Sequence, residues 1–206
     1  MSNTQGYNGF QSWFGGSGGA PTWAQSTRRI ASGNGTAIYF GDPVMPVISS
    51  ATGYITQGSP GTTTLAGIFV GCKYLSTAQK RVVWNNYWPG SDATGDVEAY
   101  VIDDPNAQFI VQCSSSTFEV TGTVTSWTSS PVGQLAQFSI GTGNTANGQS
   151  GAYLSALGTT NSYPFIVRDM YIGVSNGGDP TSLYNKVIVG FNNEWLRGNS
   201  AVTGIS

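Results

Sequence analysis

The sequence contains no histidine, and this absence excludes several chemistries at once. Histidine is the commonest general base and metal ligand, and it completes the Ser-His and Cys-His nucleophile pairs. The only cysteines, Cys72 and Cys113, are too far apart for a close-spaced metal motif. No glycine-rich segment continues into the Gly-Lys-Ser/Thr of a phosphate loop. An enzyme would have only carboxylates to work with, so the sequence predicts no catalytic residue, no cofactor and no metal site.

Charge is also scarce. Charged residues make up 9% of the chain, against roughly 25% in an ordinary soluble domain, and the formal net charge is −2. No basic run is present, so nucleic acid is not a predicted partner. No stretch approaches the ~20 apolar residues of a membrane helix, and the first residues lack the charged and apolar regions of a secretory signal. We therefore predict no membrane association. A surface with few ions suits large contact areas, where charges would have to be desolvated.

The pattern of apolar residues predicts an all-β fold. No ten residues show a convincing helical period, whereas short apolar runs alternate with turns rich in glycine, proline and asparagine. We expect one compact barrel or sandwich of short antiparallel strands over residues 28–206. The expected strands are 36–40, 44–48, 53–57, 65–74, 81–84, 98–102, 107–111, 117–125, 165–174 and 186–191, and 152–157 is either a strand or a turn of helix.

Residues 1–27 are interpreted as an extended arm. The first 27 residues carry no charged side chain, and the four glycines and one serine at 15–19 are too flexible for an element interior. The segment nevertheless contains five aromatic residues, Tyr7, Phe10, Trp13, Phe14 and Trp23. A linker alone would not need them, so the arm is expected to dock its rings on a surface. That surface is either its own domain or a neighbouring subunit.

Residues 67–112 form the segment around which we expect the fold to be organised. Two strand-like runs, 98–102 and 107–111, flank the tetrad Asp103-Asp104-Pro105-Asn106. The tetrad has turn chemistry, because aspartate accepts from the backbone, proline presets φ and asparagine tolerates the third position. The sequence therefore predicts a turn here, and we interpret the two runs as a β-hairpin.

Three aromatic residues in this segment, Trp84, Tyr87 and Trp88, precede a Pro-Gly pair. Rings of this size most often fill a core or an interface, and the alternative is a platform that stacks on sugar rings. We also expect Cys72 and Cys113 to be buried free thiols, with a disulfide as the alternative.

The acidic residues form no complete catalytic or metal motif. Asp92, Asp96 and Glu98 surround a glycine, but the spacing of a calcium loop is missing, so a solvated loop is the preferred interpretation. Asp103 and Asp104 are adjacent on a turn, whereas glycoside hydrolysis needs two carboxylates about 5–10 Å apart. Both are assigned to the turn.

Several motifs occur in an order that resembles one family. They are Gly-Phe-Gln at 9–11, Gly-Asp-Pro-Val at 41–44, Gly-Ile-Phe-Val-Gly-Cys-Lys-Tyr at 67–74, Asn-Tyr-Trp-Pro-Gly at 86–90, Ala-Tyr-Val-Ile-Asp-Asp-Pro at 99–105, the closing strand 187–193 and Thr-Gly-Ile at 203–205. The chain resembles the head-decoration, or capsid cement, proteins of tailed bacteriophages. The similarity spans most of the chain and is strongest over 67–112.

The resemblance implies a non-enzymatic virion protein that binds and stabilises the outer surface of the capsid. Its implied partner is the major capsid protein, and the implied assembly is a homo-oligomer, a trimer in preference to a dimer. It would be made in the host bacterial cytoplasm and act on the capsid surface. We expect Tyr7, Phe10, Trp13, Phe14, Trp23, Trp84, Tyr87 and Trp88 to contact the capsid or sister subunits. The alternative function is a carbohydrate-binding or adhesion module of a phage tail or fibre.

Overall fold

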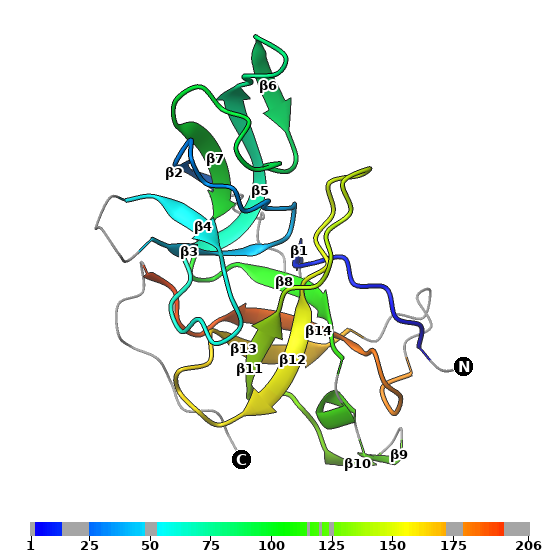
Figure 1. Ribbon diagram of the computed structural model, residues 1–206. Helices are drawn as coiled ribbons and strands as arrows, with labels where there is room; N and C mark the ends of the chain where they lie inside the picture. Colours follow the sequence, from blue (N-terminus) through cyan, green and yellow to red (C-terminus); the bar gives the residue numbers. More distant parts are fainter. Residues whose placement is uncertain are drawn as a thin grey trace.

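A computed structural model describes residues 3–13, 25–47, 53–114, 116–119, 121–123, 126–171 and 179–195. The fold is all-β, and its strands form two antiparallel sheets that pack together as in a sandwich (Figure 1). The expected fold class is confirmed. Within the described ranges, no helix is long and apolar enough to cross a membrane.

Sheet A contains strands from both ends of the chain, in the order β1-β8-β14-β13-β11-β12. These are β1 (Gln11–Ser12), β8 (Gln108–Gln112), β14 (Lys186–Phe191), β13 (Phe165–Met170), β11 (Leu135–Ser139) and β12 (Tyr153–Gly158). The sheet curls, so that Cys113, directly after β8, bridges to Leu154 of β12. Two short strands, β9 (Thr121–Thr123) and β10 (Ser126–Ser129), form a separate two-stranded sheet.

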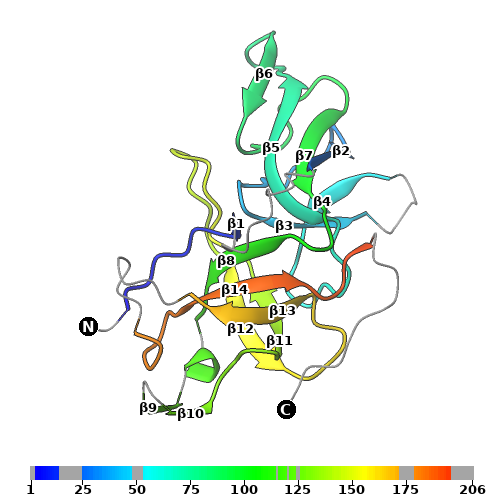
Figure 2. The same ribbon diagram turned by 180° about the vertical axis from the view of Figure 1, so that it is seen from behind.

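Sheet B is built from the middle of the chain, in the order β2-β7-β5-β3-β4, with β6 paired to β5. Its strands are β2 (Gln25–Ile30), β7 (Val97–Ile102), β5 (Gly67–Leu75), β3 (Pro43–Pro46), β4 (Ile55–Gln57) and β6 (Val82–Asn85). This sheet curls too, and a bridge between Arg29 and Tyr54 joins its outer strands. Figure 2 shows sheet B above sheet A, with the β5–β6 hairpin projecting from the top.

The predicted hairpin of 98–102 and 107–111 is wrong. Both strands exist, as β7 and β8, but β7 belongs to sheet B and β8 to sheet A. Both edges of β7 are already occupied, by β2 and β5, so β8 has no edge of β7 to pair with. The turn itself is confirmed, because the carbonyl of Asp104 accepts from Ala107 (2.9 Å) and its carboxylate from Asn106 (2.8 Å). The turn connects the two sheets instead of two neighbouring strands.

Other boundaries also differ from the expectation. The predicted strand 36–40 contains only two isolated bridges, at Ile38 and Phe40. The predicted strand 117–125 begins with a 3-10 turn, η1 (Ser116–Phe118), because Phe118 is buried in the core and its carbonyl accepts from Asn185 (3.0 Å). The predicted end of the arm, residue 27, lies inside β2.

Each sheet has its own apolar core. Phenylalanine rings dominate the core of sheet A, where Phe165 stacks on Phe10 (4.4 Å) and Phe191 (5.9 Å). Smaller aliphatic side chains, together with Phe69 and Trp88, fill the core of sheet B. Ile68 and Ile102, from sheet B strands, belong to the sheet A core and so join the two layers.

A buried carboxylate lies at the junction of the sheets. Asp42, 1% exposed, accepts hydrogen bonds from the backbone of Tyr39 (2.8 Å), the amide of Gln57 (2.7 Å) and the hydroxyl of Ser150. Ser150 belongs to the segment between β11 and β12 of sheet A, whereas the other donors belong to the sheet B half. The backbone of Gly41 continues the junction: its carbonyl accepts from Phe10 (2.9 Å) and its N–H donates to Phe69 (2.8 Å).

We predict that Asp42→Ala lowers the free energy of unfolding by about 3 kcal/mol, because three donors lose their acceptor. Asp42→Asn should cost about 1 kcal/mol, because the amide oxygen still accepts from two donors and its nitrogen can donate to Ser150 Oγ. Urea denaturation of both variants measures the difference, and equal losses would contradict the assigned role.

Burial raises the pKa of Asp42 above its usual value. Its three hydrogen bonds lower the pKa, but their effect is smaller than that of burial. The folded state therefore binds this proton more tightly than the unfolded state does. The stability of the wild type relative to Asp42→Asn should increase as the pH falls through the folded pKa, which lies above 3.8. A stability difference that decreases as the pH falls would contradict this.

Candidate functional site

The N-terminal arm meets aromatic rings of sheet A and its connections in two groups, which we together call the arm face. It consists of Tyr7, Trp13, Tyr153, Tyr171 and Tyr184. Tyr7 stacks on Tyr153, with ring centroids 4.2 Å apart, and meets Tyr184 edge-on at 6.3 Å. Trp13 meets Tyr171 edge-on at 5.3 Å. Burial, followed by the Tyr153 and Tyr184 phenols, raises the pKa of Tyr7, so the ring stays neutral at physiological pH.

Two polar side chains hold the arm in place. Gln112 accepts from the N–H of Gly6 (2.7 Å) and donates to the carbonyls of Thr4 (2.9 Å) and Tyr184 (3.0 Å). Asn3 donates to the side chain of Asn185 (2.8 Å). Residues 3–13 thus dock on their own chain, one of the two arrangements expected for the arm. Phe14 and Trp23 lie outside the described residues.

Phe10 and Trp88 are core residues, with exposed fractions of 1% and 0%. Phe10 packs among the phenylalanines of sheet A, and Trp88 meets Tyr74 edge-on at 5.1 Å in the core of sheet B. The indole N–H of Trp88 donates to the carbonyl of Asn34 (3.1 Å). Because both side chains are covered within the chain, neither can contribute contact area to a partner. Trp88 therefore fills a core, and Phe10 docks on its own domain.

Trp84 is exposed on sheet B and forms what we call the aromatic platform with Tyr100. Trp84 has an exposed fraction of 67%. Its ring is nearly parallel to that of Tyr100, with an interplanar angle of 4° and ring centroids 5.8 Å apart. The pairing of strands explains this arrangement. Lys73 of β5 lies opposite both Trp84 of β6 and Glu98 of β7, and Tyr100 follows Glu98 on the same face. The ammonium of Lys73 lies 5.0 Å from the Trp84 ring centroid.

Tyr87 belongs to a second parallel pair, which is packed against a loop. Its ring stacks on Tyr39 at 5.4 Å and 6°. The loop at 141–151 lies against Tyr39, because a Cβ at Gly143 would lie 2.2 Å from the Tyr39 ring. Asn86 donates to the carbonyl of Asn147 (2.7 Å) in the same loop. The structure therefore separates the three predicted aromatics into a core ring, a loop-packed ring and an open ring.

Sequence reasoning missed Tyr100, although a signal for it was present. Val97, Ala99 and Val101 alternate with Glu98 and Tyr100, and the first three are fully buried. A tyrosine in phase with a glutamate is expected on the solvent face of its sheet. Nothing local identifies Tyr153, Tyr171 and Tyr184 as parts of the arm face, because they meet the arm only through long-range contacts.

The acidic residues are used structurally. Asp92 caps the turn after β5 by accepting from Ser76 (2.8 Å) and Thr77 (2.8 Å), and these hydrogen bonds lower its pKa. Asp103, 5% exposed, is bound by Arg28 and Ser26 of β2. Across the described ranges, no three His, Cys, Asp or Glu side chains form a group that could hold a metal ion.

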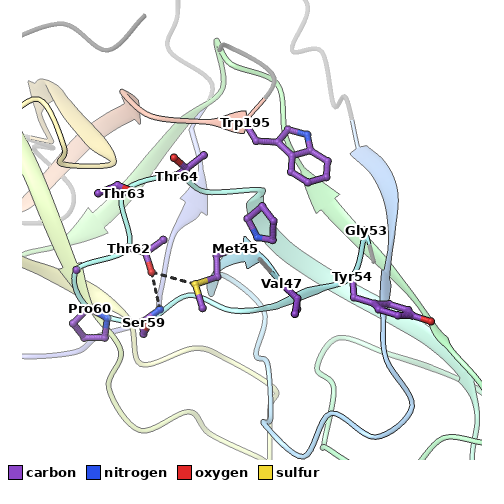
Figure 3. A pocket seen from close by; sticks show the side chains of 12 residues that line it. Met45, Val47, Gly53, Tyr54, Ser59, Pro60, Thr62, Thr63, Thr64 and Trp195 are labelled. Atoms are coloured by element: carbon purple, nitrogen blue, oxygen red, sulfur yellow. Dashed lines mark hydrogen bonds between the residues drawn. The ribbon is translucent and has the colours of Figure 1, made fainter. Parts of the chain in front are cut away.

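A recess of about 970 Å³ lies between the β3–β4 hairpin and the chain after β14 (Figure 3). Its apolar walls include Met45, Pro46, Pro60 and Trp195. One hydroxyl, that of Thr62, accepts from the N–H of Ser59 (3.2 Å) and contacts the sulfur of Met45 (3.3 Å). Among the described residues that line it, none carries a carboxylate, an amine or a thiol.

Cys72 and Cys113 are buried free thiols, as predicted. Burial raises the pKa of Cys72 to about 12 and that of Cys113 well above its usual value. Neither thiol is a nucleophile at neutral pH, because the reactive species is the thiolate. The folded protein should therefore resist labelling by a disulfide reagent such as DTNB, while the chain unfolded in guanidinium should release two equivalents of thiol. Rapid labelling of the native protein would contradict the buried placement.

No protein-family model, no curated protein and no solved structure matches this chain.

Proposed function

We propose that this chain is a virion structural protein that binds the outer surface of a phage capsid and stabilises it, as the resemblance to cement proteins suggests. The arm face is the observation that carries the proposal. It presents half-buried Tyr and Trp rings, and such rings are enriched among the residues that dominate binding energy at protein interfaces.

The way the arm is attached supports this role. The ring of Phe10 anchors the arm in the sheet A core, and Gln112 fixes its backbone, so Tyr7 and Trp13 are ordered before any partner binds. Ordered contact residues reduce the entropy lost on association. Many copies on one capsid, especially as trimers, would multiply a modest affinity for each site.

The same attachment determines how the proposal can be tested. A deletion of residues 1–27 would remove Phe10 from the core and half of β2 from sheet B, so a loss of binding would not separate contact from unfolding. Substitutions of the half-buried arm rings Tyr7 and Trp13 are more informative, because they leave Phe10 and β2 in place. Trp84 offers a matched control, because it is a surface tryptophan on the other sheet.

We predict that Trp13→Ala weakens binding to expanded capsids that lack this protein by about 2 kcal/mol, or roughly 30-fold. Tyr7→Ala should act in the same direction, and Trp84→Ala should leave capsid binding unchanged. Co-sedimentation with capsids measures the affinity, and circular dichroism checks that each variant is folded. Unchanged binding by folded Trp13→Ala and Tyr7→Ala would reject the arm face as the contact surface.

A further inference from the structure

The aromatic platform of Trp84 and Tyr100 borders an open depression in sheet B. The depression has a volume of about 510 Å³, within the range of about 300–1,000 Å³ typical of small-molecule sites. Val70, Gly71 and Cys72 of β5 line it between the two aromatic residues. Gly71 is essential to this shape, because a Cβ there would lie 3.0 Å from the carbonyl oxygen of Asn85 and would fill the space between the strands.

Amide side chains surround the depression. Gln25 of β2, Asn85 of β6 and Asn86 directly after it all line the site together with the two rings. Gln25 offers both a donor and an acceptor, the combination that a ligand hydroxyl group needs. Asn86 already donates to the carbonyl of Asn147, and the Asn85 side chain is hydrogen-bonded to Tyr74. The site therefore places flat apolar surfaces beside neutral hydrogen-bonding groups.

The charges beside the platform compensate each other. The ammonium of Lys73 lies 3.7 Å from the carboxylate of Glu98, and the hydroxyl of Tyr100 donates to the same carboxylate (3.0 Å). Of the described residues that line the depression itself, none is Lys, Arg, Asp or Glu. A nucleic acid strand would need cations along its phosphates as well as rings for its bases, and a single paired lysine does not supply them.

A second stacked pair, Tyr39–Tyr87, is half-buried and packs against a loop. That pair has nearly the same geometry, 5.4 Å and 6°, but the 141–151 loop lies against it. Trp84 and Tyr100 have a similar interplanar angle, yet Trp84 keeps 67% of its surface exposed. Leaving a large ring in water forgoes the free energy of burial, so an open platform is a candidate for occupation by a ligand.

We propose that the platform binds a neutral glycan, with a pyranose ring stacked on Trp84 and its hydroxyl groups hydrogen-bonded to the amide of Gln25. One face of a pyranose presents C–H groups, which match the electron-rich face of an indole, while its edge carries hydroxyls. This site lies on sheet B and the arm face on sheet A, so glycan binding does not depend on the proposed capsid contact. On a capsid carrying many copies, weak sites would act together on a polysaccharide.

The test is isothermal titration calorimetry of the full chain with cellohexaose, chitohexaose, maltohexaose and a mannan oligosaccharide. We expect at least one of them to bind with a dissociation constant of about 1 mM or tighter. Trp84→Ala should weaken this binding roughly tenfold or more, because stacking is lost. Tyr100→Phe keeps the aromatic ring and should retain glycan binding. Gln25→Ala removes a hydrogen-bonding group but no apolar contact, and it should weaken glycan binding.

Trp13→Ala is the matched control and should bind the glycan as the wild type does. Absence of binding by all four saccharides, or binding that folded Trp84→Ala retains, would overturn the proposal. If Trp84→Ala instead loses capsid binding and no saccharide binds, the platform is a protein contact and the glycan site is rejected. Loss of capsid binding in Trp13→Ala tests the arm face alone, so the two proposals fail separately.

Discussion

A buried carboxylate links the two sheets at their junction. Asp42 accepts donors from three chain segments, and one of them, Ser150, belongs to the sheet A half of the molecule. Removing such a carboxylate would leave buried donors without partners, so the junction specifies a single arrangement of the sheets. Gly41 next to it has φ +90°, and a Cβ there would lie 3.0 Å from the Phe10 nitrogen. The arm can approach so closely only because this residue is glycine.

The arm face depends on this junction. The hydrogen bond from Phe10 to Gly41 fixes the arm, and the arm presents Tyr7 and Trp13 on sheet A. On the other side, Ser150 ends the loop that lies against Tyr39. The curling of each sheet adds a second constraint, because bridges between outer strands reduce the free edges available for pairing with other chains. Association is then expected to use side-chain faces.

The sequence was sufficient for the fold class, the turn at Asp104 and the buried thiols, because alternation, turn chemistry and cysteine burial are local or compositional signals. It could not assign strands to sheets. Residues 98–102 and 107–111 have the local pattern of a β-hairpin. They do not pair with each other because β2 and β5 already occupy both edges of β7. Likewise Trp84 and Trp88, four residues apart, have exposed fractions of 67% and 0%. Their difference follows from strand register and from the bridge of Trp88 to Ile38, which are long-range properties.

The central functional claim is that the chain is a stoichiometric component of the virion surface. The most direct measurement is its copy number in purified virions, by quantitative mass spectrometry against the major capsid protein. The account predicts hundreds of copies in a simple ratio to that protein, since a cement protein occupies repeated sites of the capsid. A handful of copies would place it in the tail, and its absence from virions would contradict the claim.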